Sequence, residues 1–310
     1  MTRAVPLGPG AEFDAIRQMS ARWGPRASGL GDDAAVLPVP RGDALVVSTD
    51  SAIEGTHFKR EWLSAREIGY RSVVAALSDL AAMAATPIGV LVALTLPDAW
   101  RAQMLELADG IGDAVDVGRT QVVGGNLSDG RELSITTTVL GAAFTPLRRA
   151  GARLDDRVYV TGELGAPAEA IRRLTSGEPV GTVRDRFAHP VPRLDEARWL
   201  AERGASAAID VSDGLIADLR HLAAASGVAI DVDDRRVPCV NGVDVSRAMR
   251  AGEEYELIVT SPREFDREDF QRRFGVRLSE IGRVTDASQC DVTVRGASVA
   301  NVAGYDHFSR

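Results

Sequence analysis

The chain has 310 residues, of which 45% are hydrophobic, and it carries a formal net charge of −8 at pH 7. That length exceeds what one hydrophobic core usually serves, so we expect two domains, each with enough apolar residues for its own core. The acidic balance and the lack of long basic runs argue against a nucleic-acid partner. They favour an enzyme whose anionic substrate arrives with a metal ion or meets local arginines.

Hydrophobic periodicity predicts that helices and strands alternate in the first half of the chain. The expected elements are helix 12–22, strand 44–49, helix 65–85, strand 88–96, helix 99–116, strand 120–123 and strand 133–143. Strand 133–143 alternates threonines with apolar residues, which suits a strand packed on both faces. An exposed edge of that length would need a partner strand, so a homodimer is expected.

A second α/β half is predicted to follow. Its expected elements are strand 157–161, helix 168–175, helix 194–202, strand 207–210, helix 215–225, strand 229–232, strand 255–260 and a strand-rich end. Pro146 and the pair Arg148-Arg149 separate the halves. We therefore predict an α/β protein with domains 1–146 and 147–310.

Neither a signal peptide nor a membrane span is expected. The first 13 residues lack an apolar segment flanked by basic residues, and the most apolar region, residues 73–96, is interrupted by Asp79 and Pro87. The two cysteines, Cys239 and Cys290, lie far apart without metal-ligand spacing. This usage fits a reducing cytoplasm, where we expect the protein to act without a membrane partner.

Acids or Asn occur in turn-like or Gly-flanked settings in six short segments. They are Gly31-Asp32-Asp33, Ser48-Thr49-Asp50, Ser78-Asp79, Gly124-Gly125-Asn126, residues 210–213 and Gly252-Glu253-Glu254. Mg²⁺ prefers oxygen ligands and commonly sits between a few carboxylates and substrate phosphates. The pattern therefore indicates a Mg²⁺-nucleotide site, although for any single segment a simple turn explains Asp and Gly equally well.

Asp79 is harder to explain as a turn residue. It lies in a predicted helix whose neighbours after Ser72 are nearly all small or apolar. A buried carboxylate without a cation or hydrogen-bond donors costs several kcal/mol. We therefore expect a charged partner for Asp79, and a metal ion is a good candidate.

Taken in order, eight segments resemble the thiamine-monophosphate kinase family. They are residues 29–35, residues 48–58, residues 77–83, residues 123–126, residues 149–152, residues 209–215, residues 252–257 and Gly304-Tyr305-Asp306-His307-Phe308. The resemblance covers almost the whole chain. It implies the aminoimidazole-ribotide synthetase-like fold, in which an N-terminal Mg²⁺/ATP-binding domain pairs with its copy to close a dimeric β-barrel and a C-terminal α/β domain completes the active site.

The resemblance also implies an activity and its residues. The activity is ATP-dependent phosphorylation of thiamine monophosphate to thiamine diphosphate by direct in-line transfer, assisted by several Mg²⁺ ions. No general base is expected, because a phosphate-monoester acceptor is already an ionised nucleophile. The implied metal ligands are Asp33, Ser48, Thr49, Asp50, Asp79, Asn126, Asp210 and Asp213. ATP would meet Gly125, Asn126, Arg149 and Ser212, and the thiamine phosphate would meet His57, Glu253 and Tyr305.

Four positions depart from the family pattern. Asn126 and Glu254 stand where Asp is usual, Ala84 replaces a common Gly, and residues 165–167 lack the usual Asp-Ser character. Two alternatives therefore stay open: another ATP-using member of the superfamily, or a Mg²⁺-nucleotide-binding regulator without turnover. For single residues, His57 is alternatively a surface histidine, and Tyr305 alternatively pins the chain end to the core.

Overall fold

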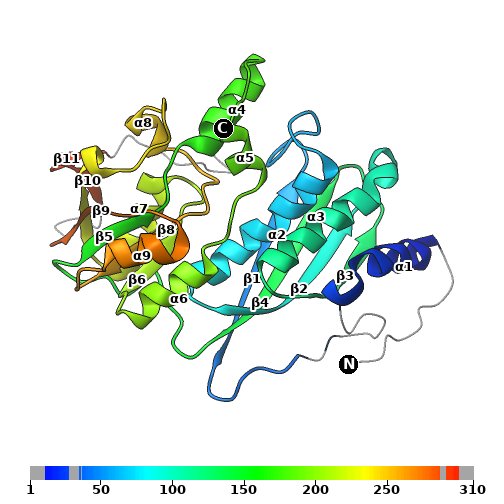
Figure 1. Cartoon of the computed structure of the whole chain (residues 1–310), viewed down its shortest axis with the longest axis horizontal. Helices are drawn as coiled ribbons and strands as arrows, with labels where there is room; N and C mark the ends of the chain where they lie inside the picture. The colour runs from blue at the N-terminus through cyan, green and yellow to red at the C-terminus, as the bar shows by residue number, and fades with distance from the viewer. Residues whose placement is uncertain (1–10, 28–34, 36, 287–290, 300–310) are drawn as a thin grey trace. The chain divides into compact units, whose positions relative to one another are not determined.

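The computed structural model describes residues 11–27, 35, 37–286 and 291–299. The chain divides into two compact units, one made of Met1–Leu80 with Ala85–Thr145 and the other of Ala81–Ala84 with Pro146–Arg310 (Figure 1). Each unit combines helices with one sheet, so the predicted α/β class is confirmed. Asp33 and Tyr305 lie outside the described residues. No described helix is long and apolar enough to cross a membrane.

The first unit is built on a four-stranded sheet with the order β1-β4-β2-β3. β4 is antiparallel to both of its neighbours, while β2 and β3 run parallel. Its elements are α1 (Ala11–Trp23), β1 (Ala44–Ile53), α2 (Ala65–Ala82), β2 (Thr86–Thr95), a 3₁₀ turn (Asp98–Gln103), α3 (Met104–Val117), β3 (Val122–Ser128) and β4 (Ser134–Ala143).

One face of this sheet carries the core. Val90, Val92, Ile135 and Val139 alternate along β2 and β4 and are buried. Helices α2 and α3 lie in front of the sheet in Figure 1, and their backbones approach closely. A Cβ on Gly110 would stand 1.8 Å from the carbonyl oxygen of Arg66, so only glycine permits this approach.

The opposite face of the sheet is less covered. The side chains of Leu45 and Val47 are 51% and 55% exposed. Thr49 and Thr138 join their hydroxyls across β1 and β4 at 3.0 Å on this face. The sheet does not close on itself within the chain. The β-barrel expected for a dimer therefore stays a prediction.

Three expectations for the first unit were wrong in detail. β4 lies between β1 and β2, so it is not an edge strand, and the edge argument for a homodimer fails. The helix expected over 99–116 is a 3₁₀ turn followed by α3. The segment Ser48-Thr49-Asp50 is not turn-like, and Gly124-Gly125-Asn126 is Gly-flanked as expected but lies in a strand, because backbone pairing with β4 and β2 continues through them.

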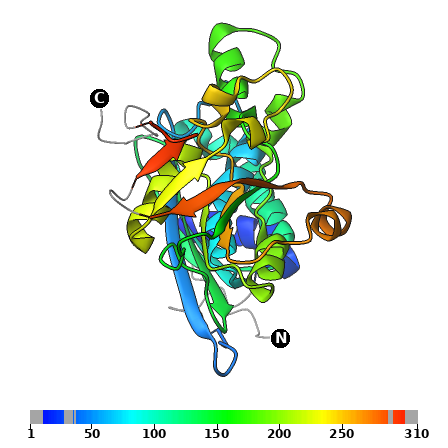
Figure 2. The same ribbon diagram turned by 90° about the vertical axis from the view of Figure 1, so that its left-hand side faces the viewer.

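The second unit contains a seven-stranded mixed sheet with the order β11-β10-β7-β9-β5-β8-β6. Figure 2 shows β10, β7 and β9 side by side in red, yellow and orange. The elements are β5 (Arg157–Thr161), α4 (Ala166–Ser176), α5 (Val183–Ala188), α6 (Leu194–Glu202), β6 (Ala207–Asp210), α7 (Leu215–Ser226), β7 (Ala229–Val232), α8 (Val245–Ala248), β8 (Leu257–Ser261), α9 (Arg267–Phe274), β9 (Leu278–Thr285), β10 (Val292–Val294) and β11 (Ala297–Ser298).

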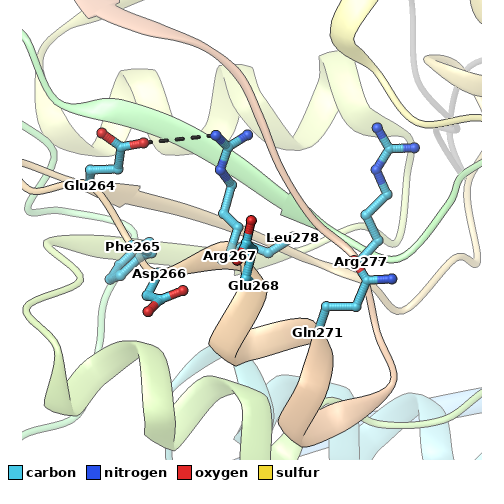
Figure 3. Close-up of a pocket in the computed structure, with 8 residues that line it drawn as sticks. All are labelled: Glu264, Phe265, Asp266, Arg267, Glu268, Gln271, Arg277 and Leu278. Atoms are coloured by element: carbon cyan, nitrogen blue, oxygen red, sulfur yellow. Dashed lines mark ion pairs between the residues drawn. The ribbon is translucent and has the colours of Figure 1, made fainter.

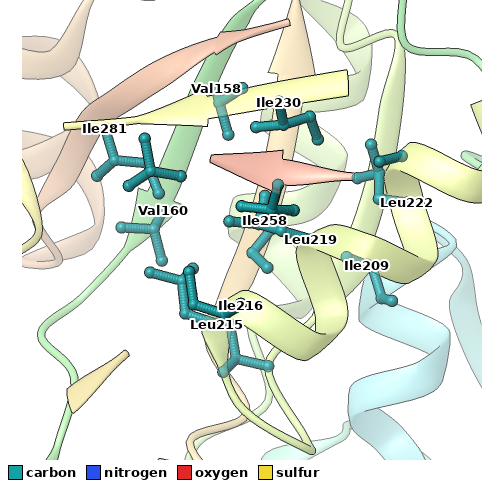
Figure 4. Close-up of a cluster of buried hydrophobic side chains, with 14 of the residues drawn as sticks. Val158, Val160, Ile209, Leu215, Ile216, Leu219, Leu222, Ile230, Ile258 and Ile281 are labelled. Atoms are coloured by element: carbon teal, nitrogen blue, oxygen red, sulfur yellow. The ribbon is translucent and has the colours of Figure 1, made fainter. Parts of the chain in front are cut away.

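Helix α7 packs on this sheet through an apolar stripe. Leu215, Leu219 and Leu222 recur at helical spacing and are fully buried against sheet residues such as Ile230 and Ile258 (Figure 4). Full burial of one such side chain contributes about 1.5–3 kcal/mol. This packing fixes α7 on the sheet, and it thereby fixes the end of the loop that leads into the helix at Leu215.

Buried charge also shapes the second unit. The carboxylate of Glu256 is fully buried, and Arg193 donates two hydrogen bonds to it at 2.6 and 2.8 Å. Arg186 and Thr161 donate at 2.9 and 2.6 Å. Burial opposes ionisation most strongly, yet these donors together hold the pKa of Glu256 below its ordinary value. The pairs link β8 to α5 and α6.

Loss of Arg193 is expected to destabilise the fold. Arg193→Met leaves Glu256 buried with Arg186 as its remaining cation, and breaking a buried pair in this way costs about 3–5 kcal/mol. Arg198→Met is the matched control, since its ion pair with Asp195 is 40% exposed on both sides and such a pair is worth about 1 kcal/mol or less. Urea unfolding checks both values, and equal midpoints for the two variants would contradict the expectation.

Candidate active site

In the first unit, strand β1 and helix α2 bring two of the predicted metal ligands together. The hydroxyl of Ser48 donates a short hydrogen bond to Oδ2 of Asp79. Asp79 is half-buried near the end of α2. This confirms that the carboxylate points into protein rather than into open solvent. Asp50 follows Ser48 at the two-residue period of β1, so both lie on the face of the sheet toward α2.

The Gly125-Asn126 segment lies away from Asp50. Gly125 stands opposite Val92 in β2, and Asn126 stands opposite Ala93. Since β1 and β3 occupy opposite edges of the sheet, three strand spacings of about 4.8 Å, roughly 14 Å, separate them. Asn126 and Asp50 of one chain therefore do not share a single ion.

Backbone packing alone also explains why residue 125 is a glycine. A Cβ there would lie 1.9 Å from the carbonyl oxygen of Val92. The close approach of β2 and β3 at this point therefore requires glycine whether or not a nucleotide binds.

His57 lies in the turn that follows β1 and is half-buried. Its Nδ1 accepts a hydrogen bond from the backbone N–H of Ile53 at 3.1 Å. An accepting Nδ1 places the proton of the neutral imidazole on Nε2. His57 is thus fixed by the backbone rather than loose on the surface.

In the second unit, three aspartates gather where β6 ends and α7 begins. Asp210 is the last residue of β6 and is buried, Asp213 is half-buried in the loop, and Asp218 is buried in the first turns of α7. Burial, followed by the charges of Asp210 and Asp213, raises the pKa of Asp218 to about 8. Burial is the larger cause, and the two neighbouring carboxylates add to it because like charges disfavour the ionisation of a further acid.

Asp218 was missed by the sequence reasoning. Among the described residues, Asp213, Asp218 and His221 form a group whose ligand atoms lie within 4.8 Å of one another. The available signal was an acid inside the apolar run Leu215–Leu219, the same signal that pointed to Asp79. His221 is exposed.

The loop that carries Glu253 is strained and tightly bonded. Glu253 and Tyr255 both adopt left-handed backbone conformations, with φ of 59° and 53°. The amide of Glu253 donates to the carbonyl of Ser212 at 2.7 Å, and those of Glu254 and Tyr255 donate to Val211 at 3.1 and 3.0 Å. Such strain persists only where surrounding bonds impose it and is common at functional sites. The loop therefore holds Glu253 beside Ser212, which was also predicted for the site.

Glu254 has a structural partner. Its Oε1 accepts a hydrogen bond from the backbone N–H of Gly165, in the turn that leads into α4. Two departures from the family pattern, at Glu254 and at residues 165–167, therefore meet in one contact. Burial raises the pKa of Glu254 to about 8, although the Gly165 N–H and the charge of Arg186 oppose the shift. The side chain is 0% exposed, so it does not face a ligand from solvent.

Arg149 lies in an exposed stretch after the first unit. Its backbone carbonyl accepts a hydrogen bond from the hydroxyl of Ser226 at 2.8 Å, which fixes the backbone at the end of α7. Because Arg149 is exposed while its backbone is held by this bond, its guanidinium is accessible to an anion.

A groove of about 620 Å³ lies elsewhere on the second unit, beside α9 (Figure 3). It is lined by Glu264, Phe265, Asp266, Arg267, Glu268, Gln271, Arg277 and Leu278. Glu264 pairs with Arg267 at 3.8 Å across its wall. The groove holds none of the predicted site residues, and its mixed charges point to no single ligand class.

The two units define a known class of protein. Residues 31–143 match the AIR synthase related protein N-terminal domain, and residues 154–295 match the corresponding C-terminal domain. The thiamine-monophosphate kinase of Methanopyrus kandleri is 36% identical over 85% of this chain and 85% of its own.

Solved structures agree. The thiamine-monophosphate kinase of Stenotrophomonas maltophilia K279a has a TM-score of 0.81 at 34% identity, covering 94% of this chain and 98% of that one. AaThiL complexed with AMPPCP and TMP has a TM-score of 0.78 at 28% identity, covering 96% and 97%. The chain belongs to the thiamine-monophosphate kinase family.

The raised pKa of Glu254 predicts a loss of stability at alkaline pH. The folded state keeps this proton up to about pH 8, whereas the unfolded chain releases it near pH 4.5. Stability should therefore fall as pH rises through that window. In Glu254→Gln the loss between pH 5 and pH 9 should shrink by about 2–4 kcal/mol. Thermal unfolding across pH measures this, with the exposed Glu264→Gln as control; parallel curves for wild type and Glu254→Gln would refute the assignment.

Proposed function

We propose that the chain transfers the γ-phosphoryl group of ATP to thiamine monophosphate and releases thiamine diphosphate. The observation that carries this conclusion is the cluster of Asp210, Asp213 and Asp218 at the start of α7, in a chain of this family. Two anions must meet in such a transfer. Acids that hold cations at the meeting point offset their repulsion. The AMPPCP and TMP bound to AaThiL support the same pair of ligands here.

The donor set fits Mg²⁺. The second unit offers Asp210 and Asp213. The first offers Ser48 and Asp50 on the face of its sheet toward α2, Asp79 from α2 itself, Thr49 on the opposite face, and the neutral Asn126 on the edge strand β3. All offer oxygen atoms, which are the ligands that Mg²⁺ prefers. Bound Mg²⁺ supplies charge stabilisation to the phosphates and orients them. Asp33 belongs to the proposed set by sequence and lies outside the described residues.

The remaining residues have binding roles. We assign Gly125, Asn126, Arg149 and Ser212 to ATP, and the planar guanidinium of Arg149 suits a phosphate. His57, Glu253 and Tyr305 are assigned to thiamine monophosphate. His57 is held by its bond to the backbone N–H of Ile53, and Glu253 is held in place by its bond to Ser212. No residue is assigned as general base, because the acceptor phosphate is already ionised.

The domains follow the same division of roles. Domain 1–146 would bind Mg²⁺/ATP and dimerise, and domain 147–310 would complete the site.

The regulator alternative now gains from Asn126 alone, because Glu254 serves a structural contact with Gly165. Two widely spaced cysteines support a cytoplasmic location.

Activity with purified components tests the function. Protein incubated with ATP, Mg²⁺ and thiamine monophosphate should form thiamine diphosphate and ADP in equal amounts, detected by chromatography. Asp79→Asn and Asp213→Asn should each lower turnover by about a hundredfold, the scale of removing one charge-stabilising element. Asp231→Asn is the control, since that carboxylate accepts from Thr293 and Gly296 on the far side of the sheet. No product from wild type would refute the function, and unimpaired turnover in both site variants would refute the metal assignment.

A homodimer is proposed on the open face of the first sheet. Leu45 and Val47 on β1 and Leu140 opposite Val47 on β4 share this face with the hydroxyl pairs Thr49–Thr138 and Ser51–Thr136. Exposed apolar rows on a sheet face mark an interaction surface. A second copy facing the same surface would bury both, as an isologous interface requires.

Charge placed on this face should separate the copies. Val47→Asp puts a carboxylate at the centre of the apolar row, where an unpaired buried charge costs several kcal/mol. Sedimentation should show a dimer for wild type and a monomer for this variant at micromolar protein. Val117→Asp is the control, since Val117 is 41% exposed on α3, away from the sheet face. A monomeric wild type, or a dimeric Val47→Asp, would contradict the proposed interface.

A further inference from the structure

Asp218 fills a cradle of backbone N–H groups. Its Oδ2 accepts hydrogen bonds from three consecutive amides, those of Ser212, Asp213 and Gly214, at 3.1, 3.1 and 3.0 Å. Gly214 immediately precedes α7, with φ of 121°, and no side chain caps the helix from that position. Successive N–H groups at a helix start ordinarily form an anion-binding nest. Here the chain's own carboxylate occupies it.

The position of Asp218 leaves this carboxylate little freedom. The residue is 1% exposed, and Leu215 and Leu219 of the same helix are fully buried around it. A polar group in such surroundings is costly unless it is hydrogen-bonded, so the three amides and the carboxylate hold one another in place. The amide of Asp218 also donates to the carbonyl of Gly214 at 2.9 Å, which closes the first turn of α7.

The loop is bonded from its other side as well. The carbonyl of Ser212 accepts from Glu253, and Gly252 packs so closely that a Cβ there would stand 2.5 Å from the same oxygen. These contacts fix the carbonyl side of the loop, while Asp218 fixes the amide side. The directions in which Ser212 and Asp213 present their side chains therefore depend on Asp218.

We propose that Asp218 is a positioning residue for the metal-nucleotide site. It holds the backbone of residues 212–214 so that Ser212 and Asp213 face the ligand, and it blocks the N–H cradle so that a phosphate cannot settle there away from the metal. This inference rests on the proposed function. It differs from direct ligation by Asp213, Asp218 and His221, whose ligand atoms lie close together.

A binding measurement separates these possibilities without relying on turnover. Mn²⁺ serves as an oxygen-binding probe for Mg²⁺, and its free concentration is followed by electron paramagnetic resonance in the presence of AMPPCP. Asp218→Leu removes the acceptor and should raise the Kd for Mn²⁺ by about tenfold or more, as lost outer-shell support does. Asp218→Asn keeps an acceptor oxygen and should stay within about threefold of wild type. His221→Ala should leave the Kd unchanged.

The matched control is Asp266→Ala. Asp266 likewise uses its carboxylate to accept a backbone N–H at a helix start, from Asp269 in α9. Asp266→Ala should lower the stability of the fold, because a backbone N–H at a helix start loses its acceptor, but it should leave the Kd for Mn²⁺ unchanged. A folded Asp218→Leu with wild-type affinity would overturn the proposal. So would equal losses in Asp218→Asn and Asp218→Leu, or a loss in His221→Ala, since each indicates a direct ligand.

Hydrogen exchange on the wild-type protein covers the case in which Asp218→Leu does not fold. The amides of Ser212, Asp213 and Gly214 should exchange as slowly as those of α7, and Asp218→Asn should accelerate them only moderately. Exchange of these amides at the rate of an open loop in wild type would overturn the proposal. A wild type that fails to phosphorylate thiamine monophosphate would refute the proposed function and would leave both readouts on Asp218 valid.

Discussion

The second unit is organised around the problem of burying carboxylates. An ionised carboxylate out of water is costly unless donors or cations surround it, and this unit buries several. Glu256 is matched by two arginines and keeps its charge. Asp218 and Glu254 have mainly backbone N–H partners, and burial raises the pKa of each to about 8. Glu256 thus joins separate elements as the charged partner of arginines, whereas Asp218 and Glu254 hold the backbone N–H groups beside them.

Elements with a strong apolar signal could be predicted from the sequence. The strands Arg157–Thr161, Ala207–Asp210 and Ala229–Val232 were predicted with their observed bounds, because short apolar runs between turns leave few alternatives. Helices α5, α8 and α9 were missed. In α9 the only buried residue is Phe270, and a helix so polar depends on its Asp266 cap and on packing that local periodicity does not reveal.

The acids of the site were predictable as residue types but their roles were not. Motif order pointed to Asp210 and Asp213, which stay proposed ligands. The acid inside the apolar helix indicated a partner for Asp79, and the structure gives the neutral hydroxyl of Ser48, so the expected charged partner stays a prediction. The contact between Glu254 and Gly165 spans 89 residues, and the bonds to Asp218 depend on the direction of three amides. Sequence spacing carries no information on either. Strand 255–260 was likewise predicted too early, because Tyr255 is left-handed and the strand begins at Leu257.

The departures from the family pattern are of two kinds. Ala84 adopts a left-handed backbone conformation, with φ of 52°, although it is not glycine, and this costs about 1 kcal/mol. The turn follows the end of α2 at Ala82. At Glu254 a longer side chain is fully buried against Gly165. Neither change removes an acid of the loop before α7. Asn126 alone removes a charge from the proposed set, because a neutral amide on the edge strand β3 stands in place of a carboxylate there.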